Sequence, residues 1–244
     1  MESKMNSKQF VKQLGQDNDA LFTASEMQVE AFFKGIDAKG KPGKKPPKKI
    51  DLIEHFTGRM VNERMNMVQI SEKIANLPAD ADPKEARLLS KQAMDEAKHF
   101  EMVKDVIEHI QGSPVNVGEA IAKEKAKPTA KGADLLDKYD AQNNPIALAL
   151  YQFIAEGRAE VVWNKMAEVI DDDYIASRYA KIARDEGFHS KIGRNQLEKL
   201  CEKPFTQACV MIMAKQFRKD LFEISCMNTT ALPEAKKLVE DAYA

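Results

Sequence analysis

The sequence contains few cysteines, and none of them is paired. Cys201, Cys209 and Cys226 are the only three in 244 residues, and no two of them form a C-x-x-C pair. A disulfide framework, a zinc ribbon and a rubredoxin-type iron centre are therefore all disfavoured. This cysteine usage predicts a reducing compartment, and we expect the protein in the cytoplasm.

Long hydrophobic runs and an excess of one charge are absent as well. No apolar stretch approaches the roughly 20 residues that a membrane-spanning helix needs, and the start, Met1–Lys4, has no apolar signal region. The 37 basic and 38 acidic residues give a net charge of −1. This balance does not favour nucleic acid or an anionic membrane as a partner. We predict that neither is a partner of this protein.

Apolar residues at helical spacing occur along most of the chain, and the length is sufficient for one large domain with a full hydrophobic core. We predict a single all-α domain over residues 1–244. Its core bundle would cover about 50–200, preceded by N-terminal helices and a basic loop (1–49) and followed by C-terminal helices (201–244). The loop, Gly40–Lys49, is rich in proline, glycine and lysine, which favours a mobile connection. Docking of an acidic partner protein is the alternative interpretation of this segment.

Four long helices are expected in the core, two on each side of a polar, interrupted connection of about 30 residues. Short turns join the first helix to the second and the third to the fourth, so each pair should pack antiparallel. The long connection can cross the length of a bundle. The expected starts are Ile50, Asp82-Pro83, Asn144-Pro145 and the acidic turn Asp171–Asp173.

One short pattern occurs twice, once in the second of these helices and once in the fourth. It reads Asp-Glu-x-x-His at residues 95–99 and again at residues 185–189. Residues three apart project from the same side of a helix, so the glutamate and histidine of each copy can bind one metal ion. The two remaining histidines, His55 and His109, have no such frame, and we expect them to be surface or packing residues.

A lone glutamate lies within the apolar stripe of each of the other two core helices. Glu63 precedes Glu96 by 33 residues, and Glu156 precedes Glu186 by 30 residues. With these separations, the two glutamates of each antiparallel helix pair should lie at the same level along the helix axes. Glu160, one turn after Glu156, is an alternative or additional ligand from the third helix.

These positions predict a set of six metal ligands. Four buried carboxylates would repel one another, whereas two divalent cations would neutralise them and two imidazoles would complete the coordination. Oxygen and imidazole ligands without thiolates suit iron or manganese. Asp95 and Asp185 could bond the outer nitrogen of a ligand histidine, with an ordinary surface role as the alternative. The predicted ligands are Glu63, Glu96, His99, Glu156, Glu186 and His189.

On these residues the chain resembles the ferritin-like di-iron carboxylate superfamily over about 50–200, and the resemblance implies an antiparallel four-helix bundle with one long crossover. Asp95 and Asp185 match the acids that, in its oxygenase branch, accept a hydrogen bond from a ligand histidine. Within the superfamily, the length and the Asp-Glu-x-x-His form are most similar to phenylacetyl-CoA epoxidase-type oxygenase subunits. Rubrerythrins are less similar, because no cysteine pairs are present. Val103 stands where ribonucleotide reductase small subunits carry a radical tyrosine.

The resemblance implies a non-haem di-iron oxidase or oxygenase. The expected cofactor is Fe/Fe, with Mn/Fe or Mn/Mn as alternatives, and the expected partners are O₂, a small apolar substrate and an external electron donor or reductase. A ferroxidase, iron-handling or peroxide-reducing protein of ferritin type is the second hypothesis. A non-enzymatic scaffold for a catalytic subunit is the third. The sequence does not determine the oligomeric state and is compatible with a homodimer.

Overall fold

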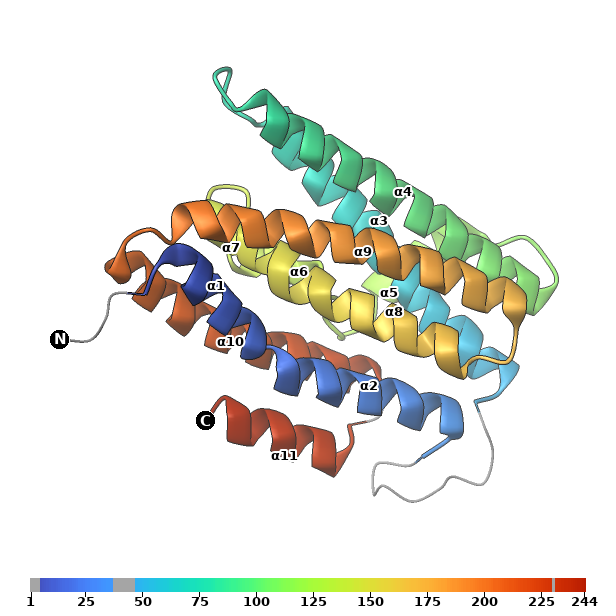
Figure 1. Cartoon of the computed structure of the whole chain (residues 1–244). Helices are drawn as coiled ribbons and strands as arrows, with labels where there is room; N and C mark the ends of the chain where they lie inside the picture. The colour runs from blue at the N-terminus through green and yellow to red at the C-terminus, as the bar shows by residue number, and fades with distance from the viewer. Residues whose placement is uncertain (1–4, 37–46, 230) are drawn as a thin grey trace. The chain divides into compact units, whose positions relative to one another are not determined.

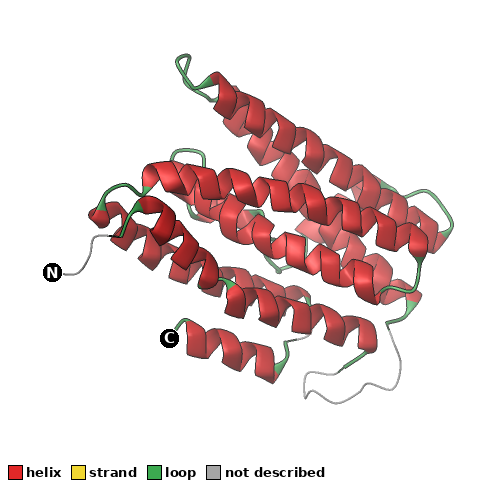
Figure 2. Ribbon diagram, viewed as in Figure 1, coloured by secondary structure: helices red, strands yellow, loops and turns green. Residues whose placement is uncertain are grey.

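The computed structural model describes residues 5–36, 47–229 and 231–244. Every element in these ranges is a helix, as Figure 2 shows, so the all-α prediction is confirmed. The chain divides into two compact units: Pro47–Asp134, here called the α3–α4 unit, and Met1–Pro46 with Leu135–Ala244, here called the α8–α9 unit. The predicted single domain and four-helix bundle both require these units to associate, and both stay predictions.

The α3–α4 unit is built on two long helices that pack along each other (Figure 1). The second begins where the sequence predicts, because the Asp82 side chain accepts a hydrogen bond from the backbone nitrogen of Lys84 and Pro83 occupies the first turn. It ends at Gly112, whose φ of 77° is costly for other residues. A short third helix packs on α3. The bounds are α3 (Lys49–Ala75), α4 (Pro83–Gln111) and α5 (Val117–Lys125).

The α8–α9 unit has a second long helical pair at its centre (Figure 1). The first helix of this pair starts at the predicted cap, where Asn144 accepts hydrogen bonds from two backbone nitrogens. The Asp172 side chain caps the second helix in the same way, through the backbone nitrogen of Ile175. The sequence did not predict that the first helix is interrupted by a π-helical segment. The bounds are α7 (Pro145–Leu150), η1 (Tyr151–Glu156), α8 (Gly157–Val169) and α9 (Asp173–Leu200).

Flanking helices cover this central pair. α2 packs against α8, α1 against α9, and α10 and α11 each pack against α2 (Figure 1). The predicted N-terminal and C-terminal helices are present, two on each side of the core helices. The bounds are α1 (Ser7–Gln16), α2 (Asp19–Lys34), α6 (Asp134–Lys138), α10 (Pro204–Asn228) and α11 (Pro233–Ala242).

Gly193 has no side chain, so the backbone of α9 can pack directly against the backbone of α7 and the π-helical segment η1. A Cβ atom at this position would lie 2.5 Å from both the Ala149 carbonyl oxygen and the Phe153 backbone nitrogen. The nearby Ser190 hydroxyl donates a hydrogen bond of 3.1 Å to the Phe153 carbonyl oxygen. Both contacts join α9 to the π-helical segment η1. They help to fix the position of η1, which ends at Glu156.

The last residues of the chain are held to the start of α2. The Tyr243 hydroxyl donates to the Asp17 carbonyl oxygen at 2.6 Å and accepts from the Leu21 backbone nitrogen at 3.3 Å. Asn18, the residue before α2, makes no capping bond because its side-chain oxygen accepts from Arg218 at 2.8 Å. Tyr243 therefore satisfies a buried N–H of the first turn that the cap residue does not reach.

Replacing Tyr243 by phenylalanine is expected to lower the free energy of unfolding by about 1–2 kcal/mol. The substitution keeps the ring but leaves the Leu21 N–H without its acceptor in a buried place. Thermal unfolding followed by circular dichroism measures this effect. An unchanged midpoint would contradict the capping role assigned to the hydroxyl.

The basic loop predicted at Gly40–Lys49 lies mostly outside the described residues, and α3 already starts at Lys49. No helix in the described part of the chain is both long enough and apolar enough to cross a bilayer.

Candidate metal centre

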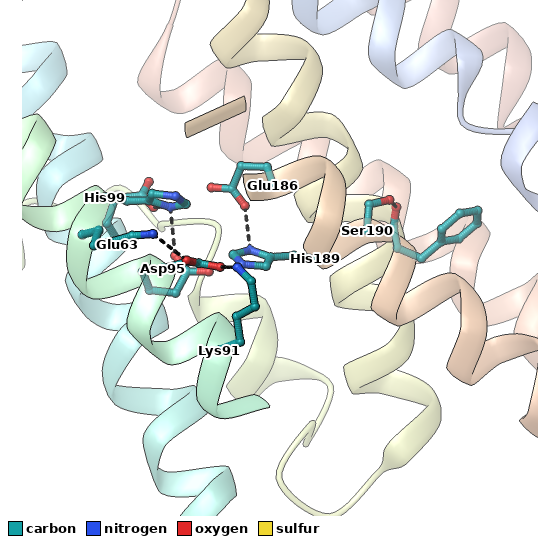
Figure 3. A network of polar contacts seen from close by, with 10 residues as sticks. Glu63, Lys91, Asp95, His99, Glu186, His189 and Ser190 are labelled. Atoms are coloured by element: carbon teal, nitrogen blue, oxygen red, sulfur yellow. Dashed lines mark hydrogen bonds and ion pairs between the residues drawn. The ribbon is translucent and has the colours of Figure 1, made fainter. Parts of the chain in front are cut away.

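The α3–α4 unit brings three predicted ligands together, a group here called the first half-site. Each of Glu63, Glu96 and His99 offers a ligand atom, and these atoms lie within 4.8 Å of one another. The His99 Nδ1 atom is 3.6 Å from Glu63 Oε2 and 3.7 Å from Glu96 Oε2. Figure 3 shows the imidazole directed at the Glu63 carboxylate. All three residues are buried, with at most 3% of their surface exposed.

The α8–α9 unit brings the other three together in a second half-site. Glu156 comes from the end of η1, and Glu186 and His189 come from α9; their ligand atoms again lie within 4.8 Å of one another. The His189 Nδ1 atom is 3.1 Å from Glu186 Oε2, and Figure 3 shows this contact. These residues are also buried, with 2% exposure or less. The structure thus places every one of the six predicted ligands in one of two groups of identical composition.

The donor atoms of each half-site suit a divalent cation. Two ligands at right angles, each about 2.1 Å from one ion, lie about 3 Å apart, and opposite ligands lie about 4 Å apart. The separations of 3.1–3.7 Å between imidazole nitrogen and carboxylate oxygen agree with these values. Two carboxylates and one imidazole are hard or intermediate donors, which iron and manganese accept. Buried Glu and His side chains that could hold a metal ion are therefore present in both units.

The π-helical segment determines how Glu156 is presented. A π turn closes its hydrogen bond over five residues instead of four, so it changes which side chains face a neighbouring helix. The segment ends at Glu156 itself. Such segments are frequent at functional sites, and this one separates the regular helices α7 and α8. Helical periodicity alone did not predict it.

Glu160 does not belong to the second half-site, although it lies close by. The group contains Glu156 and not Glu160. The Glu160 carboxylate packs against Gly187, where a Cβ atom would lie 2.6 Å from Oε1. Burial raises the pKa of Glu160, Lys191 opposes this shift, and the charge of Glu186 adds to it. The geometry favours Glu156 as the ligand from the third core helix. Glu160 lies close enough to Glu186 for the charge of Glu186 to raise its pKa.

The two acids that precede the motif glutamates differ in their surroundings. Asp95 is fully buried and forms an ion pair with Lys91 (Figure 3). A second ion pair, at 2.8 Å, joins Asp95 to Lys98. Asp185 is half-buried. The predicted hydrogen bonds, which ligand histidines would donate to these carboxylates, stay predictions. The two lysines show that Asp95 also neutralises charge on its own helix.

Three buried amides on the ligand faces were not predicted. Asn66 follows Glu63 by three residues, and Gln92 and Gln152 each precede a ligand glutamate by four. All three have at most 2% of their surface exposed. Residues three or four apart share a helix face, and an amide can donate a hydrogen bond to a carboxylate. An amide three or four residues from Glu63, Glu96 and Glu156 was the signal that could have identified them.

The remaining histidines behave as expected. His109 is exposed near the end of α4. His55 is half-buried and packs edge-on against the Phe56 ring at 5.3 Å. Burial, with a smaller contribution from Arg59, lowers the pKa of His55 to about 3, so it is neutral near pH 7. Neither residue belongs to a half-site.

The two half-sites repeat one pattern of residues. Each group combines a lone glutamate from one helix with a Glu-x-x-His pair from the next. No family model, curated protein or solved structure matches this chain.

Proposed function

We propose that the two half-sites face each other and form one di-metal centre inside a ferritin-like four-helix bundle. The observation that carries this proposal is their identical composition: one lone glutamate and one Glu-x-x-His pair in each unit, all buried. α3 and α4 would supply one half of the bundle, and α7–α8 and α9 the other. The connection from Gly112 to Asn144 is long enough to cross the bundle between the two halves.

Charge balance supports a pair of ions rather than one. The four glutamates carry four negative charges, and two divalent cations neutralise them while the imidazoles stay neutral. Burying this many ionised carboxylates without cations is costly, so without metal they would have to take up protons. The same ligand set is the one that di-iron and di-manganese bundles use.

The proposed activity is that of an O₂-activating di-iron oxidoreductase acting on a small organic substrate. A bound, reduced iron pair would supply electrons for the reduction of O₂. In a monooxygenation, one oxygen atom enters the substrate and the other leaves as water, so two electrons and two protons must come from an external donor. A reductase or another electron carrier is therefore the expected partner.

The residues of the chain would position the ions and exclude water. The glutamates and histidines would hold the cations, and buried apolar side chains lie one or two turns from them: Met60 and Val103 in the α3–α4 unit and Trp163 in the α8–α9 unit. A dry surrounding protects a reactive site from side reactions. These side chains also favour an apolar substrate over a charged one.

Metal analysis tests the proposal. The purified protein is titrated anaerobically with Fe(II), desalted and analysed for iron, and its optical spectrum is recorded before and after O₂ is added. We expect two ions per chain and a transient absorption change on exposure to O₂. Zero or one tightly bound ion per chain would overturn the di-metal centre. A very large assembly that stores the added iron would favour the ferritin-type alternative.

A further inference from the structure

α10 carries a row of apolar side chains that faces solvent. Phe205 is 81% exposed and Ile212 is 74% exposed, and Ala208 and Cys209 between them are exposed as well. The spacing of three, four and seven residues places all four on one side of the helix. The opposite side is buried through Val210, Ala214, Phe217 and Leu221, and it packs toward α1 and α2 (Figure 1).

An aromatic and a β-branched residue at this level of exposure, two turns apart on the same side of one helix, are unusual on a monomeric surface. Single exposed apolar residues need no explanation, whereas a contiguous group points to an interaction site. The near-zero net charge of −1 also opposes association only weakly. The row Phe205, Ala208, Cys209 and Ile212 is here called the α10 stripe.

The α10 stripe is complementary to itself when two copies run antiparallel. If the two-fold axis passes between Ala208 and Cys209, Phe205 of one copy lies opposite Ile212 of the other. The small residues Ala208 and Cys209 then face each other at the centre, where they allow the helices to approach closely. An isologous contact requires this kind of reciprocal pairing.

The charges at the ends of the stripe agree with the same register. Glu202 precedes the helix, Lys215 follows the stripe, and both are exposed. With the axis between residues 208 and 209, Glu202 of each copy lies at the level of Lys215 of the other. Opposite charges thus flank the apolar centre on both sides, and a parallel arrangement would lose this match. The Lys215 ammonium also donates a hydrogen bond to the carbonyl oxygen of Ala244.

We propose that the α10 stripe is a homodimer interface in which α10 packs antiparallel on α10 of a second copy, centred on Ala208 and Cys209. One helix face is smaller than the standard area of a stable interface, so the dimer is reversible and its population depends on concentration. The interface does not involve the metal ligands and does not depend on the proposed function.

Sedimentation velocity on the full chain over a wide concentration range tests the dimer. We expect the mass to rise from 27.4 kDa toward twice that value. Phe205→Lys and Ile212→Lys should each weaken dimerisation at least tenfold, without loss of helix content because both positions are exposed. A monomer at every concentration would overturn the proposal, as would a dimer that neither substitution weakens.

A charge-reversal cycle tests the register. Glu202→Lys and Lys215→Glu should each weaken the dimer, because each places like charges opposite one another, and the double variant should restore most of the loss. Lys237→Glu on α11 is the matched control: it is exposed and makes the same charge change as Lys215→Glu, but it lies outside the interface. Failure of the double variant to recover would overturn this register.

Cross-linking gives an independent readout. In the proposed register the two Cys209 residues lie close to each other near the axis, so a short bis-maleimide should join two chains through them. Cys201 is fully buried, and a Cys226→Ser background removes the half-buried third thiol. Cys209→Ser should abolish the product. If the dimer is seen in sedimentation and Cys209 does not cross-link, the proposed centre of the interface is wrong.

Discussion

Replacing Glu186 by alanine is expected to reduce the bound metal from two ions per chain to one or none. Glu186 is 1% exposed, and its carboxylate is 3.1 Å from the His189 imidazole, so it is a central member of the second half-site. Its removal takes away an anionic ligand that no water molecule can replace in charge. Metal content after Fe(II) loading and desalting is the measurement, with circular dichroism as a check that the helices are retained.

Three further substitutions make the result interpretable. Glu168→Ala removes an acid from the exposed side of α8, where 68% of the side chain is exposed, and should leave the metal content unchanged. Glu156→Ala and Glu160→Ala decide between the two candidates on the third core helix. We expect loss of metal from the first and at most a weaker affinity from the second. Retention of both ions by Glu186→Ala would refute the ligand assignment.

Replacing Gly193 by alanine is expected to destabilise the protein by about 3 kcal/mol. The added methyl group would lie 2.5 Å from two backbone atoms, the Ala149 carbonyl oxygen and the Phe153 nitrogen. Backbone cannot rotate away as a side chain can, so α9 must separate from η1. For a chain of this size the thermal midpoint should fall by roughly 6–12 °C.

The same change should also weaken metal binding. Glu156 lies on η1 and the other two ligands of the second half-site lie on α9, so separating these elements spreads the three donors. Gly118→Ala is the control, because the nearest atom to a Cβ there is at an ordinary 3.7 Å. It should be neutral or stabilise α5 by about 0.5–1 kcal/mol, since alanine is the better helix former. A Gly193→Ala protein as stable as the parent would contradict the close approach.

Capping residues made several helix boundaries predictable from the sequence. Asp82 followed by Pro83, and Asn144 followed by Pro145, each predicted a helix start that the structure confirms with a capping hydrogen bond. Gly112 ends α4 for a local reason as well, because its φ is positive. A cap depends only on residues within one turn, so it can be recognised without knowledge of the rest of the fold.

The π-helical segment and the glycine that faces it were not predictable in this way. A π turn breaks the regular period between Tyr151 and Glu156, and nothing in the apolar spacing marks it. Gly193 has no unusual dihedral angle; its role comes from a backbone 40 residues earlier in the chain. Contacts of this kind are properties of packing, which a sequence pattern does not encode locally.

The amino-acid sequence by itself determined the helical class, most helix boundaries and the identity of the six candidate ligands, because caps, periodicity and i, i+3 spacing act within a few residues. The tertiary structure decided which of these residues meet. It gathered Glu63 with the first motif and Glu156 with the second, placed Glu160 outside the group, and exposed the α10 stripe. The physical reason is that the distance between side chains on different helices depends on how closely their backbones pack, and that is set by residues such as Gly193.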